Sequence, residues 1–97
     1  FLKSHPQFKI AQKQYKNSMF GGMLSVLIKG SASRAMEITQ KLQLFTTATS
    51  LGGVESLIEH RKSVEGDDSK TPENLLRISV GIEHIEDLKN DWKQALT

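Results

Sequence analysis

Three segments of the chain carry apolar residues at helical spacing, and each predicts a helix with one apolar face. The first helix begins near Pro6 and ends near Asn17. The second follows a serine cap, either Ser31 or Ser33, and the third closes the chain after Gly81. Their apolar stripes are, in chain order, Phe8, Ala11 and Tyr15; Ala35, Ile38 and Leu42; and Ile85, Leu88, Trp92 and Leu96.

Two segments between these helices predict strands of clear character. Residues 23–29 are nearly continuous in apolarity, which is typical of a strand covered on both faces. Residues 75–80 instead alternate between apolar and polar side chains. This alternation predicts that Arg77 and Ser79 share one face of the strand, opposite the apolar residues Leu76, Ile78 and Val80.

The remaining segments predict two shorter strands and a loop. Residues 44–49 form a Thr-rich strand and residues 56–60 form another. Residues 61–74 contain Gly66, Pro72 and a single apolar side chain, which predicts an exposed, mobile loop. The whole pattern predicts an α+β domain.

Length and composition fit one small domain. The chain has 97 residues, of which 37% are hydrophobic, so a modest core is expected. The absence of cysteine excludes disulfides, thiolate metal sites and cysteine nucleophiles. No apolar run approaches the roughly 18 residues that a membrane-spanning helix needs. Because the chain opens on Phe1 rather than on methionine, we expect it to be a piece of a longer protein.

Charge is distributed unevenly, although the formal net charge is only +2. Residues 1–41 hold seven Lys and Arg against one acidic residue, whereas residues 42–97 hold six against ten. A nucleic-acid site would need basic and aromatic residues together on one element, and here the lysines are scattered over three predicted elements. A solvated surface therefore explains the basic half better than a phosphate-binding face, with a basic interaction module as the alternative.

Most sequence signatures of catalysis and metal binding are absent. His5, His60 and His84 lie far apart in the sequence and are predicted to be ordinary surface residues. The chain has no G-x-S-x-G motif, and its glycine pairs match neither the dinucleotide fingerprint nor the P-loop. No metal site is predicted, and the glycine pairs are interpreted as turns.

Arg77 and the turn that begins at Thr49 are the two candidates for chemistry. A guanidinium among apolar neighbours on a strand needs an anion, which is either a structural carboxylate or a ligand. In the turn, a hydroxyl and backbone N–H groups can converge on an anionic oxygen, or they can form a plain turn. Together the two sites would make a clamp for a carboxylate. The residues of the turn are Thr49, Ser50, Leu51, Gly52 and Gly53.

Five motifs follow one another along the chain: Ser4-His5-Pro6-Gln7, Phe20-Gly21-Gly22-Met23-Leu24-Ser25, Leu44-Phe45, the run SLGGVESLIEH from Ser50 to His60, and the run LLRISVGIE from Leu75 to Glu83. In this order they resemble the C-terminal domain of the pyridoxal-phosphate-dependent enzymes of Cys/Met metabolism, the trans-sulfuration family. The resemblance covers nearly the whole chain, and its two longest motifs are specific.

The resemblance implies a fold-type I enzyme in which residues 1–97 form the small, substrate-clamping domain. This domain would pack a mostly antiparallel sheet of about four strands, with helices on it, against a larger cofactor domain. In the family, the arginine that corresponds to Arg77 binds the substrate α-carboxylate. The serine that corresponds to Ser50 and the amide of Leu51 would bind the same carboxylate. Thr49, where many members carry glutamate, would bear on substrate specificity. A forked anchor at the carboxylate would fix the orientation of the amino acid.

The resemblance also implies that the cofactor, pyridoxal 5'-phosphate, and the catalytic residues belong to a preceding large domain. No stretch here resembles them, so no lysine is nominated for the Schiff base and residues 1–97 alone are expected to be inactive. The 61–74 segment lacks the P-A-x-M-T-H-like run of the family, so no contacts are transferred to it.

The full-length protein is expected to be a cytoplasmic homotetramer that takes an amino-acid substrate and has no nucleic-acid or membrane partner. The expected reaction is γ-replacement on an O-acylhomoserine by cysteine, as in cystathionine γ-synthase. Cystathionine γ- or β-lyase or methionine γ-lyase activity is the alternative.

Overall fold

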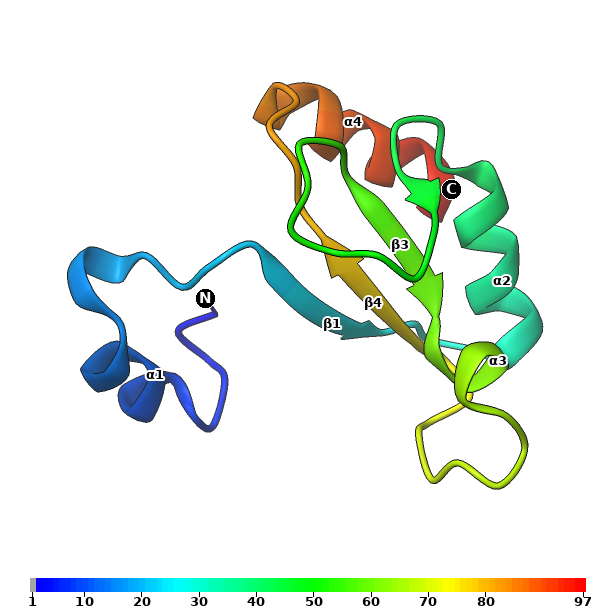
Figure 1. Ribbon diagram of the computed structural model, residues 1–97, viewed down its shortest axis with the longest axis horizontal. Coiled ribbons are helices and arrows are strands. Elements are labelled where there is room, and N and C mark those ends of the chain that lie inside the picture. The colour runs from blue at the N-terminus through cyan, green and yellow to red at the C-terminus, as the bar shows by residue number, and fades with distance from the viewer. Residues whose placement is uncertain (1) are drawn as a thin grey trace.

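A four-stranded sheet forms the centre of the protein in a computed structural model, which describes residues 2–97 (Figure 1). The strand order is β1-β4-β3-β2; β4 is antiparallel to both of its neighbours, and β2 runs parallel to β3. The predicted α+β class and mostly antiparallel sheet are therefore confirmed. The strands are β1 (Met23–Leu27), β2 (Thr46–Thr47), β3 (Leu57–His60) and β4 (Leu75–Ser79).

Two longer helices, α2 and α4, cover one face of the sheet, whereas α1 stands clear of it, beyond the start of β1 (Figure 1). The helical elements are α1 (Phe8–Gln14), the 3₁₀ turn η1 (Lys16–Ser18), α2 (Ala32–Lys41), α3 (Arg61–Glu65) and α4 (Ile85–Leu96). Within residues 2–97, none of these helices is both long enough and apolar enough to cross a membrane.

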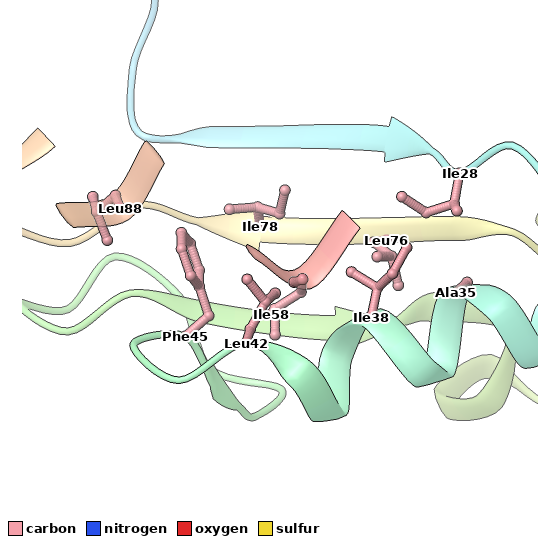
Figure 2. Close-up of a cluster of buried hydrophobic side chains, with 10 residues drawn as sticks. Ile28, Ala35, Ile38, Leu42, Phe45, Ile58, Leu76, Ile78 and Leu88 are labelled. Carbon is pink, nitrogen blue, oxygen red and sulfur yellow. The ribbon is translucent and has the colours of Figure 1, made fainter. Parts of the chain in front are cut away.

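The hydrophobic core lies between the sheet and these two helices (Figure 2). Ser31 caps α2, since its hydroxyl accepts a hydrogen bond from the amide of Arg34 at 3.4 Å, which settles the choice between the two predicted caps. The predicted stripes of α2 and β4 are confirmed, because both bury their apolar residues in this core. The core residues are Ile28, Ala35, Ile38, Leu42, Phe45, Ile58, Leu76, Ile78, Leu88 and Ala95.

The first strand differs from its prediction, because its side chains are largely exposed in the described chain. Met23 keeps 40% of its surface exposed and Leu27 keeps 61%. The reason is topological: within residues 2–97, β1 is an edge strand that pairs with β4 alone, so one of its sides has no neighbouring strand. The apolar run indicated a strand correctly, but it does not indicate what covers the strand.

Three further predictions differ from the structure, wholly or in part: the surface position of His60, the loop over residues 61–74 and the apolar stripe of α4. His60 is buried rather than on the surface, and its ring joins the Ser63 hydroxyl to the carbonyl of Glu73. Residues 61–74, which were predicted as a loop, begin with helix α3. The contacts of His60 with Ser63 and with Glu73 attach both ends of this segment to the end of β3. The buried face of α4 is rotated relative to the predicted apolar stripe, because Ala95 is buried while Leu96 is half exposed.

Asp91 of α4 joins this helix to the chain that leaves α2. Its buried carboxylate accepts hydrogen bonds from the amides of Gln43 at 2.9 Å and Leu44 at 2.8 Å, and from the side chain of Gln94 at 2.9 Å. Burial by itself raises the pKa of the Asp91 carboxyl, but these hydrogen bonds outweigh burial and leave its pKa lowered. The sequence analysis missed this residue, since nothing in the helical pattern marks an aspartate as buried.

We expect Asp91→Asn to lower the free energy of unfolding by about 1–3 kcal/mol at pH 7, because the amide group turns a donor toward backbone N–H groups. Since the folded-state pKa lies below the unfolded value of about 3.9, the stability due to Asp91 is present above that pH and is lost as the pH falls through the folded pKa. The gap between wild type and variant should therefore shrink on acidification.

Urea unfolding followed by Trp92 fluorescence at pH 7 and in steps to lower pH measures both effects. Asp68→Asn, at an exposed aspartate, is the control and should stay within about 0.5 kcal/mol of wild type at pH 7. A gap for Asp91→Asn that stays constant with pH would show that its carboxylate charge contributes nothing.

Candidate functional site

The face of the sheet opposite the core carries polar side chains at its centre. Because side chains alternate along a strand, Arg77 and Ser79 of β4 lie on the face away from α2 and α4. Across the ladders, Arg77 pairs with Glu59 of β3 on one side and with Ser25 of β1 on the other. The predicted alternation of β4 is therefore confirmed, and it brings a charged group to the middle of the sheet.

The turn that follows Thr49 crosses this polar face and is held there by two side chains of β4. Arg77 donates from Nη2 to the carbonyl of Thr49 at 2.6 Å and to that of Ser50 at 3.3 Å. The hydroxyl of Ser79 accepts a hydrogen bond from the amide of Gly52 at 2.8 Å. The two segments predicted to form a clamp therefore do meet, although they are far apart in the sequence.

The residues that follow the turn, up to Ser56, are hydrogen-bonded to the chain just after β4. Ser56 donates to the carboxylate of Glu83 from its amide at 2.6 Å and from its hydroxyl at 2.7 Å, and its hydroxyl accepts from the amide of Gly81 at 2.9 Å. The hydrogen bond from the Ser56 side chain lowers the pKa of Glu83. Because the amide of Ile82 also donates to the carbonyl of Val54 at 2.9 Å, the segment 49–56 is attached along its length.

The charge of Arg77 is partly compensated by Glu59. Nη2 of Arg77 lies 3.0 Å from Oε1 of Glu59, and the same oxygen also accepts from Nη1 of Arg61. Glu59 is only 2% exposed, whereas the side chain of Arg77 keeps 21% of its surface accessible. Sequence reasoning missed Glu59; the signal that could have revealed it is a register that pairs residue 59 with residue 77.

The predicted site residues Thr49, Ser50, Leu51 and Arg77 are thus brought together, but not through the expected atoms. The turn meets the guanidinium with carbonyl oxygens, not with a hydroxyl, because Thr49 and Ser50 contribute their backbone. Within residues 2–97, the amide of Leu51 donates no hydrogen bond, and neither do Nη1 and Nε of Arg77. These unused donors are what an incoming carboxylate would need.

Comparison with known proteins places this arrangement in a family. The chain matches the Cys/Met metabolism PLP-dependent enzyme family over residues 1–97. Cystathionine gamma-synthase of Mycobacterium tuberculosis is 45% identical over 100 residues, which cover 98% of this chain and 25% of that protein. Cystathionine gamma-lyase of Saccharomyces cerevisiae is 42% identical over 105 residues, which cover 98% of this chain and 26% of that protein.

A solved structure agrees with this placement. The crystal structure of metB from Corynebacterium glutamicum superimposes with a TM-score of 0.84 at 46% identity, over 98% of this chain and 26% of that one. The chain therefore belongs to the Cys/Met metabolism family of pyridoxal-phosphate-dependent enzymes. It spans about a quarter of the length of the curated relatives that it matches.

Within residues 2–97, no hydrogen bond or ion pair joins a lysine to Arg77 or to the segment 49–53. The described contacts therefore nominate no lysine for the Schiff base of pyridoxal phosphate. Lys41 and Lys89 pair with glutamates on their own helices, and Lys62 binds the carbonyls of Asp67 and Ser69. Over the same residues, no group of three or more histidine or acidic side chains is placed to hold a metal ion.

Gly81 tests whether the attachment of the segment 49–56 matters. A Cβ at this position would lie 2.6 Å from the carbonyl carbon of Glu55 and would clash with the carbonyl oxygen of Val54, so the backbone must shift. We expect Gly81→Ala to cost about 1–3 kcal/mol in unfolding free energy. In the full-length protein the same variant should raise KM, because the turn moves relative to Arg77.

Gly53→Ala is the matched control, since nothing lies within 4 Å of a Cβ there. This control should leave both the melting temperature and KM near their wild-type values. Equal behaviour of the two variants would show that the turn does not depend on its contact with Gly81.

Proposed function

We propose that this chain is the substrate-clamping domain of a trans-sulfuration enzyme and that Arg77 binds the α-carboxylate of its amino-acid substrate. The observation that carries the proposal is the state of the Arg77 guanidinium. Its Nη2 corner is fixed by Glu59 and by the carbonyl of Thr49, while the rest of its fork has no partner within residues 2–97. A carboxylate oxygen can accept a charge-assisted hydrogen bond from either of these remaining nitrogens, Nη1 or Nε.

The neighbouring turn supports the same proposal. The unbonded amide of Leu51 and the hydroxyl of Ser50 lie one and two residues before Gly52, whose own amide is held by Ser79. A carboxylate on Arg77 would therefore meet further donors on a segment that is already attached to the sheet. A site whose donors are fixed in advance loses less entropy when the substrate binds.

The exposed apolar residues of β1 indicate where the rest of the enzyme would pack. Met23 and Leu27 share the face of the sheet that carries Arg77, because they alternate with Leu24 and Val26, which pair with core residues of β4. Apolar side chains beside a polar site are typical of a surface that another domain covers. We propose that a preceding large domain packs here and that Arg77 lines the cleft between the two domains.

In this arrangement the chain contributes recognition, and the large domain contributes the chemistry. Pyridoxal phosphate, when bound there, supplies the electron sink for carbanion chemistry at the amino acid. Arg77, Ser50 and Leu51 bind the carboxylate and fix how the bonds of the α-carbon are oriented. The chain by itself would therefore bind substrate weakly and would be inactive.

We further propose γ-replacement as the reaction, in which the sulfur of cysteine displaces the acyloxy group of an O-acylhomoserine, which leaves as a carboxylate, to form cystathionine. Support comes from cystathionine gamma-synthase of Mycobacterium tuberculosis, which is 45% identical over nearly the whole chain. The yeast cystathionine gamma-lyase, at 42% identity, keeps cleavage as the second candidate. Thr49 places a neutral side chain at the edge of the site, and its effect on substrate choice is part of this proposal.

Arg77→Lys in the full-length enzyme should raise KM for the amino-acid substrate about 10- to 100-fold, because an ammonium group offers no fork to the carboxylate. The matched control is Arg34→Lys, at an arginine whose partners are Glu37 and the carbonyl of Leu96, away from the turn. Steady-state kinetics of both variants measure the effect. An unchanged KM in Arg77→Lys would mean that Arg77 has a purely structural role.

A second experiment separates the candidate reactions. We expect the full-length enzyme to form cystathionine from an O-acylhomoserine and cysteine, and this product is measured directly by chromatography. Incubation with cystathionine alone gives the competing rate of cleavage. If cystathionine is cleaved and never formed, the lyase assignment replaces γ-replacement.

A further inference from the structure

We propose that Glu59 is a positioning residue for Arg77, which holds Nη2 of the guanidinium and leaves Nη1 and Nε as donors for the substrate carboxylate. The inference rests on the proposed function of Arg77 and adds a residue to that site. Glu59 would not touch the substrate, because it acts through Arg77. Its role follows from its register, its burial and the way in which its oxygens are used.

The register places the two side chains together before any other contact is considered. Glu59 and Arg77 are direct partners in the antiparallel ladder of β3 and β4, so both side chains stand on the same face. Oε1 of Glu59 lies 3.0 Å from Nη2 of Arg77. Both strands lie inside the sheet, since β3 is flanked by β2 and β4, and β4 is flanked by β1 and β3. The pair is therefore carried by the most constrained part of the backbone.

The contact uses only one corner of the guanidinium. The hydrogen bonds from Arg77 to the carbonyls of Thr49 and Ser50 leave from Nη2 as well, so three acceptors converge on one nitrogen. Nη1 and Nε of Arg77 have no partner in the described chain. A forked pair between Glu59 and Arg77 would have used two nitrogens and left fewer for a ligand.

Arg61 prevents Glu59 from neutralising Arg77 completely. Its Nη1 shares Oε1 of Glu59, and its Nη2 pairs with Oε1 of Glu65 at 2.9 Å. One buried carboxylate thus lies between two guanidinium groups, and with Glu65 the cluster holds two positive and two negative charges. Glu59 therefore divides its charge between Arg77 and Arg61.

The burial of Glu59 is poorly explained by stability alone. Its Oε2 is buried and has no hydrogen-bond partner within residues 2–97. Buried polar atoms are nearly always paired, and an unpaired carboxylate oxygen is destabilising. A glutamate placed only to strengthen the fold would use both oxygens, whereas a group that has to hold a single corner of Arg77 needs one.

The test compares Glu59→Ala with Glu59→Gln in the full-length enzyme. Glutamine keeps an oxygen that can accept from Nη2 of Arg77, whereas alanine removes it. We expect Glu59→Ala to raise KM for the amino-acid substrate about tenfold with kcat changed less than about threefold, and Glu59→Gln to restore KM to within about threefold of wild type. Glu65→Ala is the matched control, because Glu65 contacts Arg61 but not Arg77, and its KM should be unchanged.

Arg61→Gln keeps the test decisive if Glu59→Ala fails to fold, which a melting curve of each variant will show. Without Arg61, Glu59 is free to pair fully with Arg77, so we expect KM to rise about threefold or more at unchanged kcat. A wild-type KM in Glu59→Ala or in Arg61→Gln would overturn the proposal. So would a Glu59→Gln enzyme whose KM is raised as much as that of the alanine variant.

Different outcomes would overturn the carboxylate site and the positioning role of Glu59. If Arg77→Lys leaves KM unchanged, the carboxylate site itself is wrong, and the role of Glu59 falls with it. If Arg77→Lys raises KM but Glu59→Ala does not, the site stands and only the positioning role is lost.

Discussion

A positive charge in the middle of a sheet has to be balanced within the fold, and this requirement organises one whole face of the domain. Arg77 stands on one of the two internal strands, where water does not surround it. Glu59 supplies a carboxylate from the adjacent strand, and Thr49 and Ser50 supply carbonyl oxygens from a turn. The turn lies across the sheet because the charge needs those oxygens.

The same constraint links recognition to folding. The groups that hold Arg77 also fix the path of the segment 49–56, and Ser79, Gly81 and Glu83 continue that attachment beyond the arginine. The contacts lie at Thr49, Ser50, Gly52, Val54 and Ser56, so they hold the segment at intervals along its length. Most polar groups of this face therefore hold one another in position. The amide of Leu51 and Nη1 and Nε of Arg77 are donors that keep no partner within residues 2–97.

The fold separates this polar face from the packing that stabilises it. The core lies entirely on the other side of the sheet, where α2 and α4 cover the apolar residues of β3 and β4 (Figure 2). Changes on the polar face can therefore leave the core packing intact. The chain spans about a quarter of the length of its relatives, which fits the proposed division between substrate recognition here and cofactor chemistry elsewhere.

The sequence by itself determined most of the elements and drew attention to Arg77. The helical stripe of α2, a serine cap at Ser31 or Ser33 and the alternation of β4 follow from local rules of geometry, and the same alternation made Arg77 conspicuous. Only the tertiary structure decided which residues meet. The pairing of Glu59 with Arg77, the burial of Asp91 and the exposed edge of β1 depend on register and on layer order, and neither is encoded in the periodicity of any one segment.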